Sequence, residues 1–193
     1  MVEIRIFDDM EQCTDEEIYR MLPFVSAHRQ EEAMKFKFTF GRFACLKSMI
    51  MLQEMVREHK HLTKDIKLTF EYGEHGKPSL KEFPDIHFNI SHCKNGIAVA
   101  ISDKPIGIDI ESFHKAEECL VRKTMNKSEE EIINNADDSS EMFTVFWTKK
   151  EAVLKLHGTG IIDDLHNVLS GDEMIETVTN NPKKYVYSVA RCQ

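Results

Sequence analysis

The segment from Phe40 to about Glu58 most constrains the fold of this 193-residue chain. Its apolar side chains, among them Phe43, Leu46 and Ile50, cover an arc that is too wide for a helix on a protein surface. Such a helix has to be covered on more than one side. The segment therefore predicts a central helix that packs on a sheet.

Stretches with strand character surround this helix and supply the sheet. They cover residues 2–7, 67–72, 86–92 and 97–101. Asn95 and Gly96 lie between the last two stretches and are a strong signal for a hairpin turn. A strand followed by helices and a meander of strands is typical of an α+β unit.

The pattern then begins again in the second part of the chain. A strand is predicted at 106–111, helices at 116–123, 128–135 and 140–157, and closing strands at 165–169, 174–178 and 185–190. This order repeats that of the first part in outline, although the two parts share no evident sequence identity. We therefore expect two similar α+β halves, residues 1–103 and 104–193, with a shared site in the cleft between them.

Charge and composition restrict the possible functions and locations. The net charge of −8 argues against a general nucleic-acid binder, so an anionic ligand would require a local basic cluster. The longest apolar run, residues 48–56, is too short to span a bilayer. No secretory signal is visible, and five widely spaced cysteines argue against a disulfide framework or a zinc site. We expect a cytoplasmic protein that binds neither nucleic acid nor membrane.

A pair of carboxylates lies on the strand predicted at 106–111. Isoleucines alternate there with Gly107, Asp109 and Glu111, so the two carboxylates project from the same face. Mg²⁺ is commonly held by one or two carboxylates together with water and phosphate oxygens, which points to a phosphorylated ligand. The alternative is a half-buried edge strand whose acidic face is solvated.

The last long helix carries a second candidate group. Trp147, Glu151 and Lys155 are spaced four residues apart and therefore share one helix face. The alternative is again a structural one, because a Glu–Lys pair at this spacing is commonly a solvated pair that adds about 0.2–0.5 kcal/mol.

Three further residues are candidates for contact with an anion. Lys77 lies between a glycine and a proline, in a rigid turn that suits an anion contact and equally an ordinary surface loop. Ser91 and His92 are adjacent on a predicted strand and point to opposite faces, which disfavours a serine hydrolase dyad. His92 alone suits a phosphate contact and equally an ordinary surface position.

These separate signals occur in an order that resembles a known signature. Segments 76–78, 88–92, 107–111 and 147–155 closely resemble the motifs of the 4′-phosphopantetheinyl transferases, specifically the monomeric two-half type that activates peptide synthetases such as surfactin synthetase. The resemblance covers about residues 20–165. Members of this family move 4′-phosphopantetheine from coenzyme A onto a serine of a carrier protein and release 3′,5′-ADP. Their fold is a pseudo-dimer of two α+β halves with the active site in the cleft, which agrees with the repeat inferred above.

The resemblance also implies roles for individual residues. It assigns Asp109, Glu111 and Glu151 to Mg²⁺, and it gives Lys155 a catalytic place near the pyrophosphate, beside Glu151. Glu129 matches the carboxylate proposed as the general base, but a glutamate in a first helical turn is favoured by the helix dipole alone. Positions that contact the phosphates or nucleotide of coenzyme A match Arg29, Arg42, Lys77, Ser91 and His92.

The implied function is a Mg²⁺-dependent transferase that acts as a monomer. Coenzyme A is its co-substrate, and an apo acyl or peptidyl carrier protein is its partner. The alternative is a protein of the same fold that binds coenzyme A or a carrier protein without transfer. A coenzyme A-dependent acyltransferase is disfavoured, because no activated nucleophile is evident near the anion-binding residues. The sequence does not identify the carrier protein.

Overall fold

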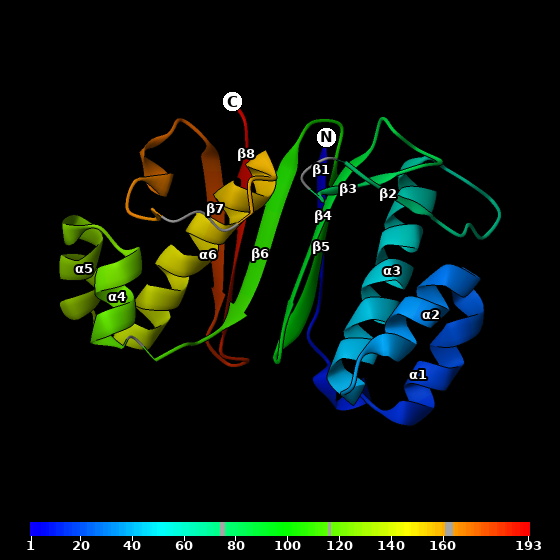
Figure 1. The fold of residues 1–193 in the computed structure, drawn as a ribbon, viewed down its shortest axis with the longest axis horizontal. Helices are drawn as coiled ribbons and strands as arrows, with labels where there is room; N and C mark the ends of the chain where they lie inside the picture. Colours follow the sequence, from blue (N-terminus) through cyan, green and yellow to red (C-terminus); the bar gives the residue numbers. More distant parts are fainter. Residues whose placement is uncertain (74–75, 116, 161–163) are drawn as a thin grey trace.

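Two antiparallel sheets face each other in the middle of the molecule. The computed structural model describes residues 1–73, 76–115, 117–160 and 164–193. Helix α3 (Thr39–His59) covers the outer side of one sheet, and helix α6 (Ser139–His157) covers the outer side of the other (Figure 1). The layers therefore run helix, sheet, sheet, helix.

Each half supplies one sheet and its helices. Apart from α3, the N-terminal half contains β1 (Val2–Phe7), α1 (Asp15–Met21), α2 (Ala27–Lys35), β2 (Phe70–Tyr72), β3 (Pro78–Leu80), β4 (His87–Cys93) and β5 (Gly96–Ser102). Apart from α6, the C-terminal half contains β6 (Ile106–Ser112), α4 (Glu118–Thr124), α5 (Lys127–Asn134), β7 (Met174–Asn180) and β8 (Tyr185–Arg191).

The two main sheets have the same connectivity. Their strand orders are β1-β5-β4 and β6-β8-β7, while β2 and β3 form a separate pair. In each half the first strand pairs with the last, and the last forms an antiparallel hairpin with the strand before it. The predicted α+β fold of two similar halves is confirmed. The boundary between residues 103 and 104 stays a prediction.

The central position predicted for α3 is confirmed. Phe43, Leu46, Leu52 and Val56 are spread around this helix, and each is 0% exposed. They belong to one hydrophobic cluster with the apolar side chains of β4 and β5. The wide apolar arc is thus buried between the sheet on one side and the shorter helices α1 and α2 on the other.

Strand β6 connects the two halves. Its isoleucines pack in one cluster with Ala98 and Ala100 of β5, which fills the space between the sheets. The backbone N–H of Ile108 donates a hydrogen bond of 2.9 Å to the side-chain oxygen of Asn89 on β4. This contact fixes β6 beside β4, so residues of both strands border the same cleft.

The opposite face of β6 requires a glycine. Helix α6 comes so close that a Cβ atom on Gly107 would lie 2.0 Å from the carbonyl oxygen of Ala152 and 2.4 Å from the backbone nitrogen of Leu156. These are backbone atoms, so they cannot move aside as a flexible side chain can. Glycine at this position therefore permits the close packing of α6 on β6.

We expect Gly107→Ala to lower the free energy of unfolding by about 1–3 kcal/mol, as in other overpacked cores. Chemical denaturation followed by circular dichroism measures this change. Gly73→Ala is the matched control, because among the described residues a Cβ there would meet no atom closer than 3.9 Å. An unchanged denaturation midpoint for Gly107→Ala would contradict the close packing.

The strand predicted at 165–169 is wrong. This segment forms a turn followed by a short 3₁₀ helix, Val168–Ser170. The carbonyl oxygen of Leu165 accepts a hydrogen bond of 2.7 Å from Lys150 Nζ. The Asp164 side chain accepts one of 2.9 Å from the backbone N–H of His166. These contacts hold the backbone in a turn, and residue alternation does not reveal them.

The start of α5 also differs from the sequence-based interpretation. The helix begins at Lys127 rather than at residue 128, and its N-cap, Asn126, forms a reciprocal capping box with Glu129. The start predicted for α4, residue 116, lies outside the described residues, and the observed helix begins at Glu118.

Two global features bear on the predicted location. Within the described ranges, no helix combines the length and the apolar character that crossing a membrane requires. All five cysteines are free thiols.

Candidate functional site

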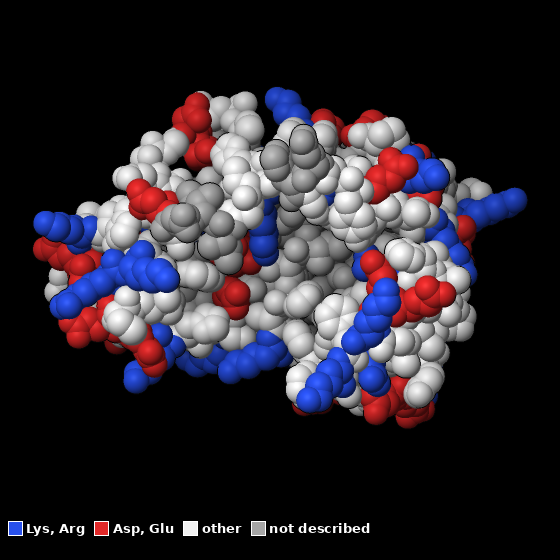
Figure 2. All heavy atoms as spheres, in the orientation of Figure 1, with Lys and Arg blue, Asp and Glu red and all other residues white. Residues whose placement is uncertain are grey.

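A cavity with charged walls lies between the two halves. Its volume is about 390 Å³. Figure 2 shows a hollow in the middle of the molecule, with acidic and basic side chains beside it. We call it the carboxylate cavity, and it is lined by Ile90, Ser91, His92, Asp109, Glu111, Trp147, Glu151 and Lys155. The structure therefore brings together the predicted metal ligands, Lys155, Ser91 and His92.

Asp109 is the centre of the polar contacts in this cavity. It lies in the middle of β6 and is 2% exposed. Its Oδ1 accepts hydrogen bonds from Lys155 Nζ at 2.6 Å and from Ser91 Oγ at 2.8 Å. Lys155 Nζ also lies 2.9 Å from Ser91 Oγ. Ser91 belongs to β4, so this group joins both halves at one point.

The second carboxylate oxygen of Asp109 lacks a partner. Among the described residues, no group forms a hydrogen bond with Oδ2, although this atom is buried. A buried polar atom left unsatisfied typically costs about 1–3 kcal/mol. An oxygen of this kind, which Lys155 does not bind, is suited to a bound ligand that supplies positive charge.

Glu111 and Glu151 add negative charge around the same cavity. Desolvation raises the pKa of both carboxyl groups, and the negative charge of Asp109 raises both further. A hydrogen bond of 3.0 Å between Glu111 and His114 acts in the opposite direction on the pKa of Glu111. A cation between these carboxylates would reduce their repulsion, and carboxylate oxygens are the ligands that hard cations prefer.

The carboxylates do not form a ready-made metal centre. Within the described part of the chain, no three acidic, histidine or cysteine side chains are close enough together to hold a metal ion. Lys155 already occupies one oxygen of Asp109. The donor set fits Mg²⁺, which is commonly held by few carboxylates together with substrate phosphates. The complete predicted metal site is not assembled.

His92 and Trp147 form the borders of the cavity. The ring of His92 remains exposed to solvent, yet the surrounding protein partly desolvates it and lowers its pKa. It makes an edge-on contact with Phe40 of α3, with ring centroids 5.6 Å apart. Trp147 stacks on Phe143, which holds it on the cavity side of α6. His92 thus presents a largely neutral ring rather than a fixed positive charge.

Arg42 and Lys77, two of the residues matched to coenzyme A contacts, both donate hydrogen bonds to backbone carbonyl oxygens. Arg42 Nε donates a hydrogen bond of 2.9 Å to the carbonyl oxygen of Phe36, and Arg42 does not line the carboxylate cavity. This contact ties the start of α3 to the end of α2. The structure therefore gives Arg42 a local structural contact, and its predicted contact with coenzyme A stays a prediction.

Lys77 binds backbone atoms at the end of α6, and its predicted contact with a phosphate stays a prediction. Its ammonium group donates to the carbonyl oxygens of Lys155 at 2.8 Å, Leu156 at 2.9 Å and Ile106 at 3.3 Å. These carbonyls lie at the end of α6 and the start of β6, where partial negative charge favours a cation. Burial lowers the pKa of Lys77. The residue connects the N-terminal half to the helix that carries Glu151.

We expect Lys77→Met to lower the free energy of unfolding by about 1–3 kcal/mol, because the end of α6 loses a shared charged donor. Thermal unfolding measures the change, and Lys81→Met is the control, since Lys81 is exposed on the neighbouring loop. Unchanged stability combined with weaker coenzyme A binding would instead favour the phosphate contact predicted for Lys77.

Glu129 lies outside the carboxylate cavity. Its Oε2 atom accepts a hydrogen bond of 2.8 Å from the backbone N–H of Asn126 and lies 2.8 Å from Lys150 Nζ. The side chains of Glu129 and Lys150 are 7% and 1% exposed. Glu129 therefore does not line the cavity that contains Asp109 and Glu151. Its role as general base stays a prediction, and its contacts indicate a structural ion pair.

Arg29 borders a second and larger cavity, of about 530 Å³. It adjoins the carboxylate cavity, since Ile90 and His92 line both. We call it the aromatic cavity, and it is lined by Arg29, Glu32, Lys35, Phe36, Cys45, Ser48, Phe70, Pro78, Phe88, Asn89, Ile90 and His92. Phe70 was not predicted to lie at a site, because it has the ordinary pattern of a strand residue, and Phe88 was included only as part of the 88–92 segment, without a role of its own.

Sequence comparisons match both halves of the chain. Residues 105–191 match the family model described as 4′-phosphopantetheinyl transferase superfamily. Residues 12–104 match the model described as 4′-phosphopantetheinyl transferase, N-terminal. The two matches meet between β5 and β6, and together they include every residue that lines the carboxylate cavity.

Individual relatives show the same similarity. The 4′-phosphopantetheinyl transferase psf-1 of Bacillus pumilus is 27% identical over 83% of this chain and 68% of its own length. The 4′-phosphopantetheinyl transferase ffp of Bacillus subtilis is 29% identical over 77% of this chain and 66% of its own length. The 4′-phosphopantetheinyl transferase AcpT of Escherichia coli (strain K12) is 34% identical over 45% of this chain and 47% of its own length. The chain spans about two thirds of the length of the first two relatives.

Proposed function

The chain belongs to the 4′-phosphopantetheinyl transferase superfamily, and we propose that it transfers 4′-phosphopantetheine from coenzyme A to a serine of an apo-carrier protein. One observation carries the proposal: Lys155, Ser91 and Asp109 are in contact, one oxygen of Asp109 is buried without a partner among the described residues, and Glu111 and Glu151 line the same cavity. A protein that only binds coenzyme A has no need for this costly arrangement of buried charge.

Mg²⁺ fits the carboxylate cavity as the cofactor. We propose that carboxylates among Asp109, Glu111 and Glu151 would hold it together with phosphate oxygens of coenzyme A, rather than as a preformed three-carboxylate site, and that it would neutralise charge on the diphosphate. The support is the buried oxygen of Asp109 that has no partner among the described residues and the position of Glu111 and Glu151 at the same cavity, where desolvation and then the charge of Asp109 raise the pKa of both carboxyl groups.

The protein side chains orient the diphosphate for transfer. In the reaction, the serine oxygen forms a bond to phosphorus while the bond from phosphorus to the oxygen of 3′,5′-ADP breaks. Lys155 Nζ lies beside Asp109 in the cavity, so it can stabilise the charge that develops on the departing phosphate. The hydroxyl of Ser91 forms hydrogen bonds with both Asp109 and Lys155 and so helps to orient the two side chains.

The aromatic cavity accounts for the nucleotide end of coenzyme A. Phe70 and Phe88 are stacked, with ring centroids 4.9 Å apart, and supply an apolar wall for a planar base. Arg29 and His92 border the same cavity and are the proposed phosphate contacts. Since this cavity adjoins the carboxylate cavity, one extended ligand can occupy both.

The alternative is a protein that binds coenzyme A or a carrier without transfer. Mass spectrometry of a panel of apo-carrier proteins, incubated with coenzyme A and Mg²⁺, separates the two functions. Transfer adds the phosphopantetheine mass to one serine, and excess chelator abolishes the addition. No covalent product with acyl, polyketide or peptidyl carriers would favour the binding function. We further propose that the chain acts as a monomer in the cytoplasm.

A further inference from the structure

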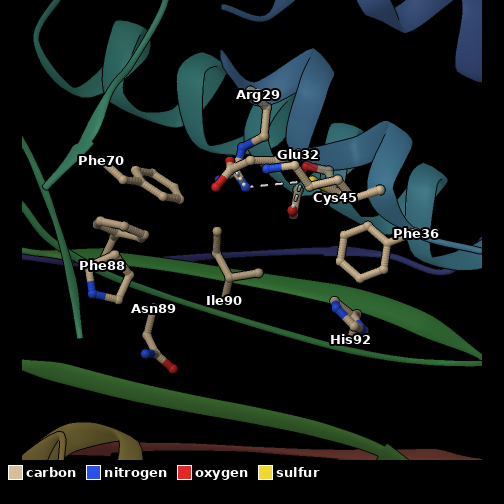
Figure 3. A pocket seen from close by; sticks show the side chains of 12 residues that line it. Arg29, Glu32, Phe36, Cys45, Phe70, Phe88, Asn89, Ile90 and His92 are labelled. Carbon is tan, nitrogen blue, oxygen red and sulfur yellow. Dashed lines mark hydrogen bonds and ion pairs between the residues drawn. The ribbon is translucent and has the colours of Figure 1, made fainter. Parts of the chain in front are cut away.

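The aromatic cavity contains a carboxylate beside its main cation. Figure 3 shows Arg29 and Glu32 of α2 side by side at the cavity, with Phe70 to the left of them and Cys45 nearby. Glu32 Oε2 lies 3.2 Å from Arg29 Nη1. Their side chains are 27% and 12% exposed, so solvent screens this ion pair only in part.

Further contacts hold Arg29 in place. The guanidinium carbon lies 4.5 Å from the centre of the Phe70 ring, and Nη1 lies 3.5 Å from the sulfur of Cys45. The guanidinium is thus positioned by Glu32, Cys45 and Phe70 before any ligand enters. An anion that approaches Arg29 also approaches the carboxylate of Glu32.

The other positive groups of this cavity compensate only weakly. Lys35 is exposed, so its attraction for an anion is screened by solvent. The pKa of His92 is lowered, which favours a neutral ring at pH 7. The cavity is therefore well built for a planar ring, through Phe70 and Phe88, and poorly built for a dianionic phosphate group.

We propose that Glu32 makes this site nearly indifferent to the 3′-phosphate of coenzyme A, so that dephospho-coenzyme A is an almost equally good donor. This rests on the proposed function. In the transfer the serine loses its proton, its oxygen bonds to phosphorus, and the phosphorus–oxygen bond to the nucleotide breaks. The leaving group is then 5′-AMP instead of 3′,5′-ADP, and no additional reactant is needed.

Binding measurements test the site without requiring transfer. Titration calorimetry in the presence of Mg²⁺ should give dissociation constants for coenzyme A and dephospho-coenzyme A within about fivefold of each other. Glu32→Gln should make coenzyme A the preferred ligand by about tenfold or more, because a charge-assisted contact with Arg29 becomes available to the 3′-phosphate. Glu31→Gln is the control, since Glu31 is exposed on the same helix and does not line the cavity.

Several outcomes would overturn the proposal. A wild-type preference for coenzyme A above about thirtyfold would show that the 3′-phosphate is recognised despite Glu32. If folded Glu32→Gln had the same ratio of dissociation constants for the two ligands as the wild type, Glu32 would not be the cause of the ligand preference. If neither ligand bound, the nucleotide would not occupy this cavity. The ratio of the two dissociation constants of the wild type is measured without any variant, so it tests the proposal even if Glu32→Gln is unstable.

Transfer assays separate this proposal from the proposed function. Equal binding of both donors without any covalent product would contradict the transferase function and leave the ligand preference intact. Transfer from coenzyme A but not from dephospho-coenzyme A would support the transferase function and contradict the proposed indifference to the 3′-phosphate. Release of 5′-AMP from dephospho-coenzyme A at a rate within about tenfold of 3′,5′-ADP release is the expected result.

Discussion

Asp109→Asn is expected to reduce kcat for phosphopantetheine transfer by at least about 10²–10³-fold, the effect of losing one group that stabilises charge in a reacting site. Asparagine has the same shape and can still accept hydrogen bonds from Lys155 and Ser91. It lacks the negative charge that a cation requires. The rate of covalent modification of a carrier protein, followed by mass spectrometry at saturating coenzyme A, measures the loss.

The same variant should remain folded. It loses an ion pair with Lys155, but it also removes the charge of Asp109 that, after desolvation, raises the pKa of Glu111 and of Glu151. We expect its melting temperature without ligands to stay close to that of the wild type. Asp85→Asn is the control, because Asp85 is exposed and pairs with Lys60 far from the cavity.

Ligand-induced stabilisation supplies a second measurement on this variant. At a hundredfold excess over its dissociation constant, a ligand adds about 2.7 kcal/mol, or about 5–11 °C for a chain of this size. Mg²⁺ with coenzyme A should produce such a shift in the wild type and a much smaller one in Asp109→Asn. Wild-type turnover by the variant would exclude the metal role. A large loss of stability without ligands would indicate that Asp109 mainly supports the strand.

The sequence predicted the fold well because its signals are local. The wide apolar arc of α3 and the alternation in β6 are properties of consecutive residues, and both correspond to what the structure contains. The segment at 165–169 was assigned wrongly because its turn depends on Lys150, which is 15 residues away from Leu165 and donates to its carbonyl oxygen. Residue alternation carries no information about such a partner.

The sequence predicted the contacts of some candidate site residues but not those of others. Asp109 and Glu111 share a strand face, and Glu151 and Lys155 share a helix face, so periodicity alone groups each pair. Lys77, Arg42 and Glu129 are different, because their charged groups are bound by protein atoms of other segments.

A match to a family motif therefore predicts which charged residue stands at a position, but it does not predict which group that residue contacts. The ammonium of Lys77 binds carbonyl oxygens of α6 in the other half of the molecule, and only the packing of the halves brings these groups together. Glu32 shows the reverse case: it became part of a site only because α2 places it beside Arg29 at the cavity.

Glu129→Gln is expected to lower the free energy of unfolding by about 3–5 kcal/mol, the usual cost of removing one partner of a buried ion pair. The substitution leaves the ammonium of Lys150, which is 1% exposed, with the carbonyl oxygen of Leu165 as its remaining partner among the described residues. For a chain of this size the melting temperature should fall by about 6–20 °C. Differential scanning calorimetry measures this, with Glu131→Gln as the exposed control on the same helix.

Kinetics distinguish this structural role from the general-base role predicted for Glu129. A general base typically contributes about 10²–10⁴-fold to kcat. If Glu129 is structural, kcat of the folded variant at low temperature should change by less than about tenfold. Lys150→Met should destabilise the chain to a similar degree, and the double variant should lose less stability than the sum of the two, because the partners act as one unit. A large fall in kcat with an unchanged melting temperature would instead establish Glu129 as the acceptor of the serine proton.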